Sequence, residues 1–148
     1  MVDPAWIALS LVERVGGKTM RALLAHFGSA QAVLKADSHE LRRVPGVGAT
    51  IAASICAVDL GAVKRNIPRW QAAGIQIITD NDPAYPARLR ALDDAPHTIF
   101  VRGVWDESLR KAEAVAIVGT RNPSEIALGA AQALAFEFAR RGHVIVSG

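Results

Sequence analysis

The fold of the C-terminal half is decided by Ala114-Val-Ala-Ile-Val-Gly-Thr-Arg121. Its first part, Ala114–Val118, is a continuous apolar run, which is typical of a strand covered on both faces. Val144–Val146 is a second run of the same kind. A helical segment separates the two, and strand, helix and strand with short connections predict a crossover unit of a parallel sheet. The predicted fold class of this half is therefore α/β.

The helix between these strands has a start signal in Asn122 and Pro123, which supply a cap and a first-turn proline. Along it, Ile126, Ala130, Leu134 and Phe138 recur at i, i+4 spacing. We expect this helix to end around Arg140.

A candidate phosphate site follows the first strand directly, at Gly119, Thr120 and Arg121. Ligands of open α/β sheets bind at the carboxyl ends of strands. Gly119 permits close backbone approach, Thr120 offers a hydroxyl, and the planar fork of Arg121 matches phosphate oxygens. Glu125 could repel an anion at the helix start, so we expect Arg121 to dominate over the helix dipole. The alternative is that Arg121 pairs with a surface carboxylate.

The composition changes at Gly74. Ile75–Thr79 and Thr98–Arg102 predict two further strands, with a turn cluster at Asp80–Pro83. We therefore expect a helical domain over residues 1–73 and an α/β domain over residues 74–148.

Within the helical half, Leu41–Ile51 resembles a helix-hairpin-helix motif. Its turn carries Gly46 and Gly48, which let the backbone approach a phosphate, and the next helix presents unpaired N–H groups. Val15–Lys18 is a degenerate earlier copy, so the two form a tandem. A contact with the DNA backbone is one interpretation, and a tight turn that mediates only protein contacts is the other. Residues 49–57 contain no Lys or Arg, so Lys18, Arg42 and Arg43 must supply the charge.

The overall balance of charge permits a polyanionic partner without demanding one. The 148 residues carry a formal net charge of +3, and residues 1–73 hold nine Lys and Arg against five Asp and Glu. The 51% hydrophobic content excludes disorder, and no apolar run reaches the roughly 18 residues of a membrane span. Cys56 cannot form an internal disulfide, and the histidines lack metal-ligand spacing. We expect a cytoplasmic protein without metal or cofactor.

Several of these motifs together resemble the DNA-processing protein A (DprA/Smf) family. The resemblance rests on Asp82-Pro-Ala-Tyr85-Pro86, Leu89, Asp94-Ala-Pro96, Gly103 and Ala116-Ile-Val-Gly-Thr-Arg121. The tandem hairpins are similar to the SAM-like domain that many members carry, and Val144–Gly148 is similar to the family's second strand and the loop after it.

The resemblance implies a Rossmann-like domain that binds single-stranded DNA without catalysis, protects incoming strands during natural transformation and helps to load the RecA recombinase. Gly119, Thr120 and Arg121 match the family's phosphate motif, while Ser147 and Gly148 match the opening of its second pocket loop. Ala127 departs from the pattern, because the family places a glycine shortly after the motif. Intact members form homodimers. We expect a truncated chain that lacks the dimer surface, binds more weakly and exposes an apolar sheet edge.

Two other functions stay open. A Rossmann-like nucleotide hydrolase, related to nucleoside phosphoribohydrolases, would need a glycine-rich loop with a catalytic acid, and none precedes residue 148. A protein-interaction module built on the helical hairpins would need no DNA contact.

Overall fold

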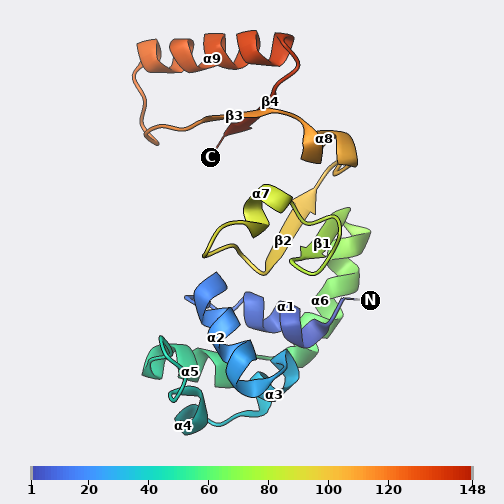
Figure 1. Cartoon of the computed structure of the whole chain (residues 1–148), viewed down its shortest axis with the longest axis vertical. Helices are drawn as coiled ribbons and strands as arrows, with labels where there is room; N and C mark the ends of the chain where they lie inside the picture. Colours follow the sequence, from blue (N-terminus) through green and yellow to red (C-terminus); the bar gives the residue numbers. More distant parts are fainter. Residues whose placement is uncertain (1, 148) are drawn as a thin grey trace. The chain divides into compact units, whose positions relative to one another are not determined.

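A computed structural model describes residues 2–147 of the chain (Figure 1). The chain divides into two compact units, Met1–Gly103 and Val104–Gly148. The first unit holds the helical region and an antiparallel pair of strands, and the second holds a parallel pair with its connecting helix. The predicted class, a helical region followed by α/β structure, is confirmed.

The first unit begins with a series of short helices. They are α1 (Pro4–Ser10), α2 (Gly17–Phe27), α3 (Ala30–Lys35), α4 (Ser38–Leu41), α5 (Ala49–Cys56), α6 (Leu60–Ala72) and, later in the chain, α7 (Ala87–Arg90). Short polar side chains explain several of the helix starts, because Asp3, Ser29, Asp37 and Asp59 each accept a backbone N–H there.

The core of the first unit lies between these helices. Its fully buried aliphatic side chains include Leu9, Met20, Leu23, Val33, Leu41 and Ile55. A second cluster of Ile7, Ile67 and Ile77 joins α1 and α6 to β1 (Ile75–Thr79). β1 pairs antiparallel with β2 (Thr98–Arg102). The predicted boundary at Gly74 therefore marks the change from helix to strand, while the compact unit continues to Gly103.

The tandem of helical hairpins is visible in the backbone. We call Arg14–Lys18 the first hairpin and Gly46–Thr50 the second. Each has a left-handed residue, then a buried valine, then a glycine that precedes a helix. The left-handed φ angles are +67° at Arg14 and +84° at Gly46, and Gly16 and Gly48 both cap a helix with φ −83°. The first copy is degenerate because an arginine occupies its left-handed position.

The second unit contains α8 (Glu107–Lys111), β3 (Ala114–Ile117), α9 (Glu125–Arg140) and β4 (Val144–Ser147). β3 and β4 pair in parallel, with Ile117 opposite Ser147. Figure 1 shows α9 along this strand pair. The crossover unit is therefore present as the sequence predicts.

Two expectations for this unit are wrong, namely that β3 is covered on both faces and that Asn122 caps the helix. β3 alternates exposed and half-buried residues, so it is covered on one face only within the described chain. In α9, Ile126 and Leu134 are exposed, and no described residue of that helix is buried, because two strands are too narrow to cover it. The helix cap is Ser124, whose hydroxyl accepts the Ala127 N–H, rather than Asn122, whose N–H bonds to the Thr120 hydroxyl in the preceding turn.

The two left-handed positions should respond oppositely to substitution. Arg14→Gly should raise the free energy of unfolding by about 0.5–1 kcal/mol, because glycine relieves the left-handed strain of a side-chain-bearing residue. Gly46→Ala should lower it by about 1 kcal/mol, since its added methyl meets nothing within 4 Å and only the backbone cost remains. Urea unfolding measures both changes. Arg14→Ala is the control: it removes the charge but keeps the strain, and a gain equal to that of Arg14→Gly would contradict the assignment.

Candidate nucleic-acid interface

The predicted phosphate residues of the second unit lie at one edge of the parallel strand pair. Gly119, Thr120 and Arg121 follow β3, which ends at Ile117. Ser147 is the register partner of Ile117 on β4. Because parallel strands end at the same edge, the structure brings these predicted residues together. Gly148 lies outside the described residues.

The side chains at this edge can meet an anion. Arg121 is exposed and makes no ion pair with any residue that the structure describes, so the alternative of a paired surface arginine has no support there. The Thr120 hydroxyl oxygen accepts the Asn122 N–H at 3.2 Å, which leaves its own O–H free to donate. Glu125 stands in the first turn of α9, so the favourable charge at this edge comes from Arg121.

The second hairpin presents an open backbone. Gly46 and Gly48 are both exposed, and an added Cβ at either would meet no heavy atom within 4 Å. No side chain caps the start of α5 at Gly48, so its first N–H groups are available to an outside acceptor. Arg42 and Arg43 are exposed just before the turn.

The first hairpin is not open in the same way. Lys18 is exposed, but Gly17 beside it is buried. A Cβ on Gly17 would lie 2.2 Å from the Ala95 carbonyl oxygen and 2.8 Å from that of Asp94. The chain's own backbone therefore covers the residue where the second hairpin has the exposed Ala49.

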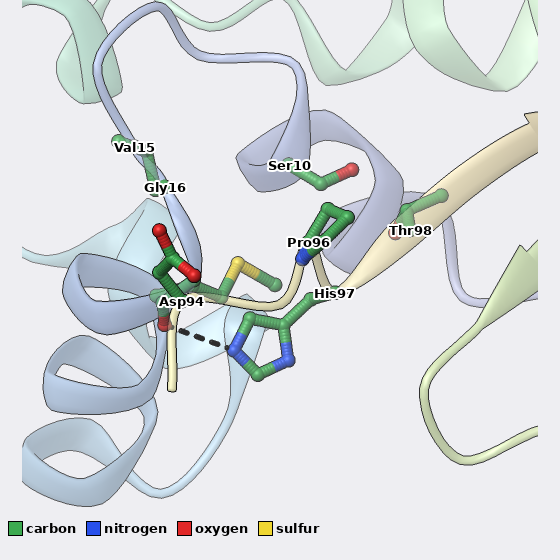
Figure 2. A pocket seen from close by; sticks show the side chains of 9 residues that line it. Ser10, Val15, Gly16, Asp94, Pro96, His97 and Thr98 are labelled. Atoms are coloured by element: carbon green, nitrogen blue, oxygen red, sulfur yellow. Dashed lines mark hydrogen bonds between the residues drawn. The ribbon is translucent and has the colours of Figure 1, made fainter. Parts of the chain in front are cut away.

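A buried polar cluster lies beside this contact, and sequence reasoning missed it. The His97 ring is bound through Nδ1 to Asp80 and through Nε2 to the Gly17 carbonyl at 3.1 Å. Each nitrogen of the ring therefore faces one oxygen atom, a carboxylate oxygen on one side and a backbone carbonyl oxygen on the other. His97 lines a pocket of about 120 Å³ together with Asp94, Pro96 and Thr98. Figure 2 shows these side chains around it. The partners are 17 and 80 residues away in sequence, so no local pattern could have revealed them.

Tyr85 extends the same cluster. Its side chain is 2% exposed, and its hydroxyl donates to the Pro96 carbonyl at 2.5 Å. Burial, assisted by the negative charge of Asp80, raises the pKa of Tyr85 above its ordinary value, while the Arg90 guanidinium acts in the opposite direction.

No group of three or more His, Cys, Asp or Glu side chains in the range 2–147 could hold a metal ion. No helix in the same range is long and apolar enough to cross a membrane.

Comparison with known protein families identifies the family to which the chain belongs. Residues 76–148, which include β2, the parallel strand pair and the Gly119–Arg121 edge, match the family described as DNA recombination-mediator protein A. The chain belongs to this family. Residues 7–58 match the SAM-like helix-hairpin-helix tandem, in agreement with the paired backbone geometry of the two hairpins. The resemblance inferred from the sequence is thereby confirmed, and the recombination-mediator family and the tandem together indicate a role in DNA processing and DNA binding.

The raised pKa of Tyr85 predicts a loss of stability at high pH. Above about pH 10 the unfolded chain releases the tyrosine proton, while the folded chain keeps it, so the free energy of unfolding should fall as pH rises. The chain has one tyrosine, so tyrosinate absorbance follows this group directly. Urea unfolding from pH 8 to about 11 measures this decline, which should be smaller in Tyr85→Phe because phenylalanine has no proton to release. At neutral pH the free energy of unfolding of Tyr85→Phe should be lower by about 1 kcal/mol, because the hydrogen bond to Pro96 is missing. Ordinary titration of the folded protein near pH 10 would refute the prediction.

Proposed function

We propose that the chain binds single-stranded DNA through the phosphate backbone, without catalysis, in the DNA processing that accompanies natural transformation and RecA recombinase loading. The proposed compartment is the cytoplasm. The family match supports recombination partners in general, and the narrower choices of single strands and RecA follow from the resemblance.

The exposed Arg121 carries this proposal. It follows β3 directly, it has no ion-pair partner among residues 2–147, and the Ser147 hydroxyl lies at the same strand edge. A guanidinium with no carboxylate partner keeps its bidentate donors for a phosphate. Contacts to phosphates position a strand without reading its bases, which suits a protein that acts on DNA of any sequence.

The second hairpin supplies a separate backbone contact. Its glycines are open, the first N–H groups of α5 have no side-chain cap, and Arg42 and Arg43 are exposed beside them. The shortage of cations on α5 itself favours the rival function, a protein contact by the helical region. Binding that is insensitive to salt would support that rival, because backbone recognition releases counterions.

Arg121→Ala should weaken binding to single-stranded oligonucleotides of every sequence by about tenfold to a hundredfold, since a charged hydrogen-bonded contact contributes roughly 1.5–3 kcal/mol. The slope of log affinity against log salt should fall by about 0.7 for the lost phosphate contact. Fluorescence anisotropy at several salt concentrations measures both quantities.

Two variants sharpen that experiment. Arg121→Lys keeps the charge and loses the fork, so it should recover only part of the affinity. Arg141→Ala removes another exposed arginine of the same unit, which pairs with Glu137 at 2.8 Å, and should leave binding nearly unchanged. Equal effects of Arg121→Ala and Arg141→Ala would reduce the site to nonspecific charge and defeat the assignment.

Gly48→Ala tests the second hairpin. Its methyl enters open space, so folding should be affected by only about 0.5 kcal/mol at the helix cap, yet close approach of a phosphate should be blocked. We expect roughly threefold weaker binding to single-stranded DNA by anisotropy. Gly16→Ala makes the same change in the first hairpin, also in open space, and serves as the matched control. Weaker binding in both variants, or in neither, would remove the second hairpin from the interface.

A further inference from the structure

We propose that the first hairpin is a docking site for the chain's own segment Asp94–Thr98, so that phosphate contact by the helical region is left to the second hairpin. The docking itself is independent of DNA, and only its consequence for phosphate contact rests on the proposed function.

The steric fit at Gly17 is the first ground. The Ala95 carbonyl oxygen lies 2.2 Å from the position that a Cβ would take, closer than any side chain could tolerate. The atoms that this Cβ would meet, in Ala95 and Asp94, belong to the backbone, so no rotation of a side chain could relieve the clash. Glycine at this position is therefore a requirement of the docked segment.

Hydrogen bonds then hold the docked segment to two helices and to the loop that carries Tyr85. His97 reaches the Gly17 carbonyl through Nε2, and the Trp6 indole N–H donates to the His97 carbonyl at 3.4 Å. The Tyr85 hydroxyl donates to Pro96. Trp6 also packs edge-on against the His97 ring, with centroids 5.6 Å apart. Because His97 and Tyr85 are almost fully buried, breaking these bonds would leave buried polar groups without partners.

The docked segment also brings a negative charge, on Asp94, to the helix start where a phosphate would bind. Asp94 and Gly16 line the same pocket at the start of α2 (Figure 2). No side chain caps that helix at Gly16, and its N-terminus carries the positive end of the helix dipole. The Asp94 carboxylate supplies negative charge there, so a phosphate would meet both a covered backbone and a like charge.

The second hairpin shows what the uncovered arrangement looks like. Ala49 takes the place of Gly17 and is exposed. The two copies share a left-handed backbone position, a buried valine and a glycine cap. The residue after that cap is covered in the first copy and exposed in the second.

Hydrogen exchange on the whole chain tests the docking with a matched pair of adjacent glycines. In Gly17→Ala the methyl must displace Ala95, and amide exchange over residues 14–19 and 94–98 should accelerate by about tenfold while the other helices keep their protection. Gly16→Ala should leave these rates unchanged, because its methyl meets nothing within 4 Å. If Gly17→Ala does not fold, His97→Phe takes its place, since it keeps a ring but removes both hydrogen bonds. Unchanged exchange over 94–98 in the folded variant overturns the docking.

Backbone amide NMR shifts during titration of the wild-type chain with a single-stranded oligonucleotide test the consequence. Shifts at residues 46–50 without shifts at residues 14–18 support it, and comparable shifts at both overturn it. Shifts at neither hairpin, together with fast exchange in Gly17→Ala, would reject the phosphate contact of the second hairpin while the docking stands.

Discussion

The close backbone approach of Ala95 to Gly17 is the contact on which the architecture of the first unit depends. It presses the segment before β2 against the start of α2, and thereby joins the antiparallel strand pair to the helices. The polar partners follow from it, because His97 can reach the Gly17 carbonyl only when the two backbones touch. The cluster of Ile7, Ile67 and Ile77 adds an apolar contact between the same parts. The compact unit therefore extends to Gly103.

This arrangement gives the two hairpins different chemical surroundings although their backbones are alike. The first has an aspartate beside its helix start and a carbonyl pressed on its glycine, whereas the second faces open space. The first copy of the motif thus contacts the segment before β2, whereas the backbone of the second copy is accessible. The second unit adds a separate set of hydrogen-bond donors at its strand edge. The strongest of them is Arg121, which has no ion-pair partner among the residues that the structure describes.

Much of the candidate interface could be predicted because it rests on local pattern. The apolar runs of β3 and β4 placed Gly119–Arg121 and Ser147 at the ends of strands, and parallel pairing then made them neighbours. The prediction that β3 is covered on both faces was wrong, because burial depends on what packs against a strand and the strand's own residues do not show that. The helix α9 has its apolar side chains at helical spacing, but two strands offer too little surface to bury them. The assignment of residues 1–73 as a separate domain stays a prediction.

The sequence by itself determined the four strands, the tandem of hairpins, the parallel crossover and the family, because turns, caps and periodicity act over a few residues. The short helices α7 and α8 were not predicted. Tertiary structure alone decided which hairpin is covered and which polar groups are buried with His97. Gly17 and His97 are 80 residues apart, and no local sequence pattern at either residue predicts their contact. Their contact exists only because packing of the core brings the two backbones together, and a contact formed by packing has no local signature.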